Sequence, residues 1–323
     1  MSSEVLRVRG LNVRYYTTRG AVHAVDDVSF SLYQGEKLGL VGESGSGKST
    51  IVLALMRLIR PPGKIEGGEV RLGDTDLVKL SEEQMRLARF SRISLVPQGA
   101  MNSLNPVMKV KYQIADAIRA HDGRISNREI DARIVELMDL VGLRREVPNM
   151  YPHELSGGMK QRVCIAMGIC MSPEVILADE PTSALDVVVQ RQVMDTLADV
   201  QARLGAAVIL VGHDMGVMAQ FVDRIAVMYA GRLMEVGPIV EVFEEPLHPY
   251  TQLLIATLPS LEERRAFKGI PGIPASLLRP PPGCTFHPRC PFAQPRCQVD
   301  VPASREVRPG RWVACHIVDG GSS

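Results

Sequence analysis

Residues 42–50 read GESGSGKST and directly follow the apolar run of residues 37–41. They fit a pattern in which a glycine, four free positions and Gly-Lys-Ser or Gly-Lys-Thr stand between a strand and a helix. The apolar run predicts a buried strand, and the spacing of Val52, Leu55 and Ile59 predicts a helix. A loop in this context surrounds a polyphosphate. The sequence therefore predicts a nucleotide-binding α/β domain.

The residue types of this loop suit phosphate chemistry. Glycines let backbone N–H groups approach phosphate oxygens, and the start of the following helix adds affinity for an anion. Lys48 supplies a charge for the terminal phosphates, and the Ser49 hydroxyl can ligate Mg²⁺. A Gly-Ser linker that happens to end in lysine is the alternative, and the flanking strand and helix argue against it. We assign ATP contacts to Gly42, Glu43, Ser44, Gly45, Ser46, Gly47, Lys48, Ser49 and Thr50.

Composition narrows the class of protein. The 323 residues include 37 basic and 36 acidic side chains, so no overall basic field indicates a nucleic-acid partner. No apolar run reaches the ~18 residues that cross a bilayer, and the N-terminus lacks a secretion signal. We expect a cytoplasmic protein. Its six cysteines are then expected to be core residues or metal ligands rather than disulfides.

Short apolar stretches in the N-terminal part predict an antiparallel sheet of short strands, at residues 5–8, 11–13, 22–25 and 28–32. Tyr15 and Tyr16 follow one of these stretches. A tyrosine at this position can stack on an adenine ring, or it can simply pack against the sheet. We assign the stacking role to Tyr15, although the pattern leaves the choice between the two open.

Two predicted buried strands, residues 93–96 and 208–211, each end at a polar residue. Gln98 stands just beyond the first, where its amide can reach a metal-bound water. His213 stands just beyond the second, where it can contact a terminal phosphate or can be an ordinary strand-end histidine.

The predicted strand at residues 175–178 delivers Asp179 and Glu180 at its end. Asp179 can hold Mg²⁺ through water, and Glu180 can orient and polarise an attacking water. An acidic pair after a strand is often only a turn. The separate nucleotide-binding loop favours the functional interpretation.

A second glycine turn, LSGGMKQ at residues 155–161, lies within a predicted helical region that spans residues 113–171. It precedes another helix, whose N-terminus can hold a phosphate, and the Ser156 hydroxyl adds a donor. Considered alone, Ser-Gly-Gly can also be an ordinary loop.

In this order, these segments resemble the ATPase subunit of an ATP-binding-cassette (ABC) transporter. The resemblance covers roughly residues 4–240 and rests on residues 42–50, Gln98, residues 155–161, residues 175–180, residues 183–186 and His213. It implies a P-loop cassette with a RecA-like core, an N-terminal antiparallel β subdomain and a helical subdomain at about residues 106–173. We expect the cassette domain at residues 1–240 and an irregular extension at residues 241–323.

The resemblance also implies roles for single residues. Two cassettes face each other head to tail, so that Ser156 and Gly158 act on the partner's ATP, while Gly157 and Asp186 complete the ATP contacts. Ser49, Gln98 and Asp179 are the expected Mg²⁺ ligands. Glu180, Gln98 and His213 are the expected catalytic residues, with Glu180 as the base.

Closer similarity, in residues 103–106, residues 247–251 and the tail, is to the ATPase subunits of dipeptide and oligopeptide importers. This implies a peripheral subunit on the cytoplasmic face of the inner membrane that powers the import of di- or oligopeptides or a related small solute. Its implied partners are a second, related ATPase, two membrane permease subunits and an extracytoplasmic solute-binding protein. Gly99 departs from the acidic residue that many such sequences carry after the glutamine, which puts contacts of this loop with the membrane partner in doubt. The alternative is a soluble ABC-type ATPase without a membrane subunit.

The tail is rich in proline and carries Cys284, Cys290, Cys297 and Cys315, with gaps of five, six and seventeen residues. Coordination can fold a segment that is poor in apolar residues. Zinc sites usually have closer pairs, whereas iron–sulfur clusters tolerate varied spacing. Some importers that this tail resembles carry such a cluster, so we expect [4Fe–4S], with Zn²⁺ or unligated thiols as alternatives. His287 or His316 can replace a cysteine, and a redox switch that acts on the ATPase is a further interpretation.

Overall fold

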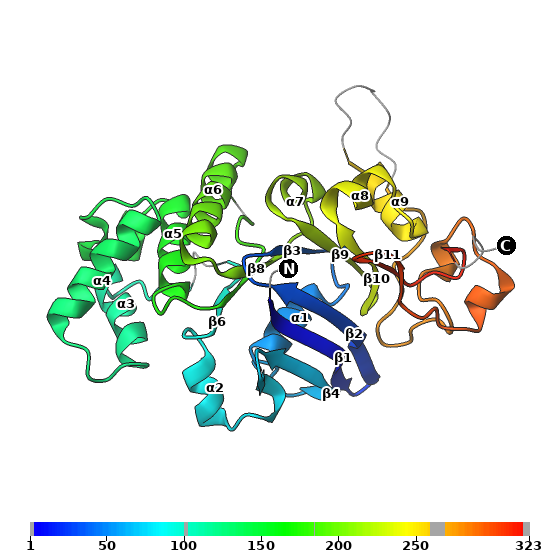
Figure 1. Ribbon diagram of the computed structural model, residues 1–323, viewed down its shortest axis with the longest axis horizontal. Helices are drawn as coiled ribbons and strands as arrows, with labels where there is room; N and C mark the ends of the chain where they lie inside the picture. The colour runs from blue at the N-terminus through cyan, green and yellow to red at the C-terminus, as the bar shows by residue number, and fades with distance from the viewer. Residues whose placement is uncertain (1–2, 100–102, 184, 259–268, 319–323) are drawn as a thin grey trace. The chain divides into compact units, whose positions relative to one another are not determined.

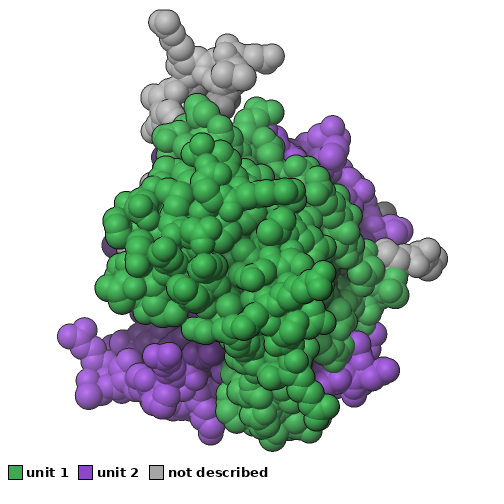
Figure 2. All heavy atoms as spheres, turned by 90° about the vertical axis from the view of Figure 1, so that its left-hand side faces the viewer, with its two compact units in different colours: residues 1–5, 32–36, 79–210 green, residues 6–31, 37–78, 211–323 purple. Residues whose placement is uncertain are grey.

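The computed structural model describes residues 3–99, 103–183, 185–258 and 269–318. The chain divides into two compact units, coloured separately in Figure 2. Unit 1 comprises residues 1–5, 32–36 and 79–210, and unit 2 comprises residues 6–31, 37–78 and 211–323. Within the described residues, no helix is both long and apolar enough to span a bilayer.

Unit 2 contains a four-stranded sheet in the order β2-β1-β4-β5, although the outer ends of β1 and β2 are grouped with unit 1. Its strands are β1 (Glu4–Thr17), β2 (Gly20–Tyr33), β4 (Gly63–Leu72) and β5 (Thr75–Asp76). The prediction of several short strands is wrong in detail, because β1 and β2 are long and continuous. Gly10 and Asp27 have positive φ values of 55° and 54°, so each strand bends there without ending.

A second set of strands in unit 2 lies in the order β11-β12-β10-β9-β3. It comprises β3 (Lys37–Val41), β9 (Arg224–Tyr229), β10 (Arg232–Pro238), β11 (Arg305–Arg308) and β12 (Arg311–Val313). In this set β3 and β9 are parallel, whereas β9–β10, β10–β12 and β11–β12 are antiparallel pairs. The helices of this unit are α1 (Lys48–Leu55), α7 (Met215–Phe221), α8 (Ile239–Glu244) and α9 (Pro249–Ala256), of which α8 and α9 pack on β10.

Unit 1 contains strands in the order β8-β7-β6, with β6 (Ile93–Val96) parallel to β7 (Val175–Asp179) and β8 (Ala207–Val211) at the other side of β7. Every residue of β7 and β8 is buried, as expected for parallel strands covered on both faces. These three predicted strands are confirmed to within one residue at either end. Figure 1 shows the mixed α/β architecture that the sequence predicts.

The helices of unit 1 are α2 (Glu82–Ala88), α3 (Val110–Arg119), α4 (Asn127–Leu140), α5 (Gly157–Gly168) and α6 (Val187–Leu204). Ser126 begins α4 with a capping box, and Ile130, Ile134 and Leu137 bury one face of it. Helix α3 packs against α4 and α5, and α5 packs against α6. Short 3₁₀ turns occupy η1 (Leu77–Lys79), η3 (Val147–Asn149), η4 (Pro152–Glu154), η5 (His287–Arg289) and η6 (Pro295–Gln298).

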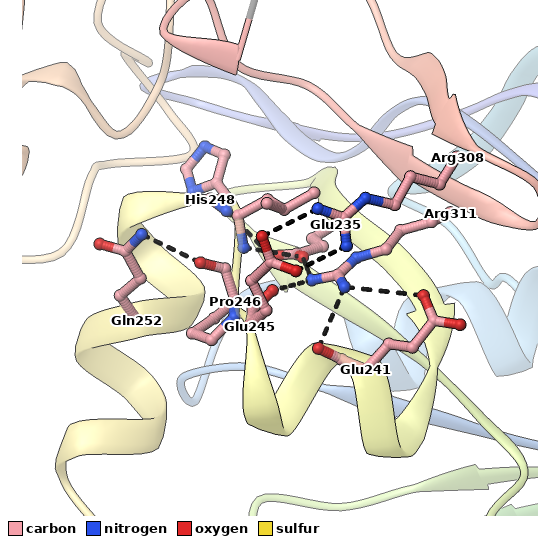
Figure 3. A network of polar contacts seen from close by, with 9 residues as sticks. Glu235, Glu241, Glu245, Pro246, His248, Gln252, Arg308 and Arg311 are labelled. Carbon is pink, nitrogen blue, oxygen red and sulfur yellow. Dashed lines mark hydrogen bonds and ion pairs between the residues drawn. The ribbon is translucent and has the colours of Figure 1, made fainter. Parts of the chain in front are cut away.

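A buried ion pair connects the C-terminal hairpin β11–β12 to the rest of unit 2 (Figure 3). Arg311 on β12 lies 2.8 Å from Glu235 on β10, and both side chains are fully buried. Arg311 also donates to the backbone carbonyls of Glu241 and Glu245, at the start and end of α8. A buried pair needs such additional hydrogen bonds to offset the cost of removing two charges from water. The hairpin is therefore held by charge as well as by strand pairing.

His248 lies beside this pair and is uncharged in the fold. Its Nδ1 accepts the backbone N–H of Tyr250 at 2.9 Å, so this nitrogen carries no proton. Its own backbone N–H donates to Glu235 at 2.9 Å. Burial lowers the pKa of His248 from its ordinary 6.5 to about 3. Protonation would require both a charge in the interior and the loss of the cap of α9.

We expect this histidine to make the protein less stable in acid. The unfolded chain binds a proton at His248 below pH 6.5 while the folded chain does not, so stability falls as the pH falls from 6.5 toward 3. The slope from this group approaches about 1.4 kcal/mol per pH unit. Urea unfolding at a series of pH values measures it.

The matched variant is His248→Asn, which keeps an N-cap acceptor without a titrating group and should flatten the slope in this range. His153→Asn, at an exposed histidine, is the control. Equal slopes for wild type and His248→Asn would contradict the assignment.

Candidate nucleotide-binding site

The predicted phosphate loop connects β3 to α1, as the sequence indicates. Gly42 and Gly47 have φ values of 147° and 106°, which L side chains rarely adopt. A Cβ at Gly42 would lie 2.0 Å from the carbonyl oxygen of Met228, and one at Gly47 would lie 2.1 Å from that of Ala24. No residue with a side chain fits at either position. The loop therefore presents backbone where a polyphosphate would bind.

Lys48, the first residue of α1, is nearly fully buried at 6% exposure. Its Nζ donates to the carbonyl oxygens of Gly42 at 2.8 Å and Glu43 at 3.0 Å, so the ammonium lies across the loop. No side chain caps the start of α1, and the N-terminus of a helix favours an anion. The buried Ser46 Oγ has no hydrogen-bond partner among the described residues. A positive charge, backbone donors and a buried hydroxyl together fit a phosphate group.

In unit 1, two predicted catalytic side chains are in contact. The Gln98 amide, two residues beyond β6, donates to the Glu180 carboxylate at 2.9 Å. Asp179 is the last residue of β7 and is 7% exposed, and Glu180 follows it with a φ of 44°. A non-glycine residue in this region is strained by about 1–3 kcal/mol, and such strain gathers at functional sites. The arrangement places a carboxylate and an amide at the carboxyl end of a buried strand.

The second glycine turn forms the start of α5. Ser156 is the N-cap, accepting the Met159 N–H at 3.3 Å, and its side chain is exposed. A Cβ at Gly158 would lie 2.6 Å from Val189 Cγ1 on α6, so Gly158 allows α5 and α6 to approach closely. Asp186 caps α6 by accepting the Val189 N–H at 3.0 Å. Gly157, the first residue of α5, completes the turn.

The remaining predicted ATP contacts lie in unit 2. His213 is exposed in the turn before α7, whose N-cap is Asp214. Tyr15 packs its ring near Gly63, where a Cβ would meet it at 2.5 Å. Tyr16 is 48% exposed, and its pKa is raised chiefly by a hydrogen bond to Glu66. The adenine-stacking role of Tyr15 stays a prediction.

The four tail cysteines lie in unit 2, and all are described. Burial, followed by the nearby Cys315, Cys297 and Cys290, raises the pKa of Cys284 to about 11. The four thiols are thus close enough to interact electrostatically. Among the described residues, however, no three or more His, Cys, Asp or Glu side chains are arranged as the ligands of a metal ion.

The predicted nucleotide site is divided between the units. Lys48 and Ser49 belong to unit 2, and Gln98, Asp179 and Glu180 belong to unit 1, so each group is described by itself. The predicted joint set of ATP and Mg²⁺ contacts stays a prediction, and Ala184 of the loop at 183–186 lies outside the described residues.

Sequence reasoning missed two residues at the phosphate loop. Arg289 and Tyr250 both contact Glu43. They are 246 and 207 residues distant from it along the chain, and no local pattern indicates either contact.

Family models match both parts of the chain. Residues 25–183 match the model described as ABC transporter, and residues 234–297 match the model described as oligopeptide/dipeptide transporter, C-terminal region. The second match covers three of the four tail cysteines.

Relatives are similar over almost the entire chain. The probable peptide ABC transporter ATP-binding protein y4tR of Sinorhizobium fredii is 42% identical, over 96% of this chain and 94% of its own length. The dipeptide transport ATP-binding protein DppD of Caldanaerobacter subterraneus is 40% identical, over 99% of this chain and 98% of its own length. The oligopeptide transport ATP-binding protein OppD of Salmonella typhimurium is 43% identical, over 96% of this chain and 93% of its own length.

Solved structures agree with this assignment. The dimeric, post-hydrolysis structure of the ATP-binding cassette MJ0796 bound to ADP and Pi has a TM-score of 0.64 and 28% identity. The match covers 72% of this chain and 98% of the MJ0796 chain. The chain therefore belongs to the family of ATP-binding proteins of ABC transporters and is an ATPase coupled to transport.

Proposed function

We propose that this ATPase powers the import of di- or oligopeptides. The observation that carries the proposal is the match of residues 234–297 to the C-terminal region of oligopeptide/dipeptide transporters. That region lies beyond the ABC transporter match, which ends at residue 183, so it carries information that a general cassette does not. The names of the full-length relatives support the same substrate class.

The proposed chemistry assigns a task to each predicted residue. Lys48 and the loop backbone would hold the terminal phosphates, and Ser49, Asp179 and Gln98 are the proposed ligands of Mg²⁺, which would neutralise phosphate charge when bound. Glu180 orients and deprotonates the attacking water. The bond from Gln98 to Glu180 fixes the carboxylate, and we assign His213 to the terminal phosphate.

The proposed assembly is a head-to-tail pair of cassettes. The exposed Ser156 and the backbone of Gly157 and Gly158 act on the partner's ATP. Asp186 lies near them, because it accepts the N–H of Val189, the residue that packs against Gly158. We infer that the partner is a related ATPase and that two permease subunits and an extracytoplasmic solute-binding protein complete the transporter, with this chain on the cytoplasmic face of the inner membrane. Residues 1–240 form the cassette, with a helical subdomain at about 106–173, and residues 241–323 form the extension.

Glu180→Gln tests the assigned base. We expect retained ATP binding and a hydrolysis rate reduced by about 10²-fold or more, because the amide cannot accept the proton of the attacking water. ATPase assays and uptake of a labelled dipeptide by proteoliposomes, which contain the complex purified from membranes, measure both effects.

The matched control is Glu174→Gln, just before β7, where the carboxylate pairs with Arg92. It should retain near-normal hydrolysis. Near-normal hydrolysis by Glu180→Gln would remove Glu180 from its role. A chain that purifies from the soluble fraction without permeases would instead support a soluble ATPase.

Ser156→Asp tests action on the partner's nucleotide. Aspartate keeps the N-cap of α5 and adds a negative charge that repels the partner's phosphates. We expect ATPase activity to fall at least tenfold, with unchanged ATP binding to the variant's own loop, measured by equilibrium binding to the isolated subunit. Ser126→Asp, the same exchange at the N-cap of α4, is the control. Unchanged activity would contradict the head-to-tail site.

We also propose that Cys284, Cys290, Cys297 and Cys315 hold a [4Fe–4S] cluster, with Zn²⁺ as the alternative. The mutual electrostatic influence of the four thiols supports a shared site. Each thiolate of a cluster binds a different iron, so its ligands stand farther apart than those of a single ion. When bound, such a group supplies cross-links that hold the irregular extension together.

Metal analysis after anaerobic purification tests this proposal. We expect iron and acid-labile sulfide in about equal amounts and a visible chromophore, both lost in Cys297→Ser. Cys164→Ser is the control, because Cys164 lies in α5 and burial raises its pKa to about 12, as expected of an inert core thiol. Zinc without colour would support the alternative, and a metal-free protein would exclude both.

A further inference from the structure

The extension contacts the phosphate loop through Arg289. Its two terminal nitrogens donate to the two carboxylate oxygens of Glu43, at 2.6 and 3.0 Å. Glu43 is the second residue of the loop. This bidentate geometry is the strongest form of an arginine–carboxylate pair.

All five N–H groups of Arg289 have acceptors. Besides the two bonds to Glu43, Nε donates to the carbonyl of Pro271 at 2.8 Å, one terminal nitrogen donates to that of Ile270 at 3.1 Å, and the other donates to the Tyr229 hydroxyl at 3.3 Å. The side chain is 3% exposed. Three of these five bonds are to residues outside the loop, and they hold the guanidinium in one orientation against Glu43.

A second residue of the extension holds the backbone of Glu43. The Glu43 N–H donates to the Tyr250 hydroxyl at 2.9 Å. Tyr250, on α9, is fully buried, and its ring lies 4.7 Å from that of Tyr229 and 5.2 Å from that of Phe286. The packing of the Tyr250 ring in this aromatic cluster therefore fixes the position of its hydroxyl.

Glu43 in turn contacts the phosphate-binding lysine. Its carbonyl oxygen accepts from Lys48 Nζ at 3.0 Å, and the same Nζ donates to the Gly42 carbonyl at 2.8 Å. Its N–H, carbonyl and carboxylate are thus all engaged, two of them by the extension. A change in the position of Glu43 would change both the loop backbone and the place of the ammonium.

We propose that Arg289 and Tyr250 are positioning residues that set the conformation of the phosphate loop, so that the C-terminal extension tunes the affinity for ATP. The inference rests on the proposed nucleotide site and adds its regulation by a part of the chain outside the cassette. In this chain the loop contacts two side chains from the extension.

Tyr250→Phe is the most conservative test, because it removes one acceptor and keeps the ring. We expect ATP binding several-fold weaker, and roughly tenfold weaker in Arg289→Met, where a charge-assisted pair is lost. The maximal hydrolysis rate at saturating ATP should stay within about twofold, because neither residue touches the reacting atoms. Equilibrium binding of a fluorescent ATP analogue and steady-state kinetics of the complex measure KM and kcat separately.

Arg308→Met is the matched control. Arg308 forms a bidentate pair with Glu245 in the same extension, at 2.6 and 2.8 Å, without contact to the loop. It should leave ATP affinity unchanged. In a double-mutant cycle, Glu43→Gln and Arg289→Met should weaken binding together by much less than the product of their separate effects.

Three outcomes decide the inference. Wild-type ATP affinity in both Tyr250→Phe and Arg289→Met would overturn it. Equal loss in Arg308→Met, or independent effects of Glu43→Gln and Arg289→Met, would also overturn it, because the extension would then act only through general stability. Failure of the wild-type chain to bind ATP would instead contradict the proposed nucleotide site itself.

Discussion

The close approach of the phosphate loop to two backbone carbonyls is the constraint on which the site depends. Gly42 lies against Met228 on β9, and Gly47 lies against Ala24 on β2, at distances that no Cβ permits. At these two glycines the loop therefore packs against backbone carbonyls of both sheets of unit 2. This contact fixes the start of α1, and with it the place of Lys48, before any nucleotide binds.

The extension is built on β10, the strand that pairs with β9. Glu235, on β10, receives Arg311 from β12 and two backbone N–H groups from the segment that leads into α9. That segment continues to Tyr250, which reaches the loop. The buried ion pair and the phosphate loop thus belong to one continuous network of polar contacts in unit 2, and removing one charge of a buried pair costs about 3–5 kcal/mol.

Much of the fold follows from local pattern. The apolar runs of β3, β6, β7 and β8 predict buried strands because period and length suffice to identify them, and the capping box at Ser126 marks the start of α4. The length of β1 and β2 was not predictable from the same rules. Polar residues that resemble turn signals there sit at bends with positive φ, where pairing with the neighbouring strand continues the sheet.

The contacts of Glu43 were beyond local reasoning for a different reason. Residue types and spacing identify the phosphate loop because its residues are consecutive in the sequence. Arg289 lies 246 residues away from Glu43, in a segment without periodicity. That arginine immediately precedes Cys290, so the side chain that holds the loop and one of the proposed metal ligands share a single turn of chain. Whatever orders the cysteine segment therefore also orders the guanidinium. The tail therefore contacts the cassette in two ways, through the ring of Phe286 against Tyr229 and through the charged pair of Arg289 with Glu43, and both contacts depend on the order of the same short segment.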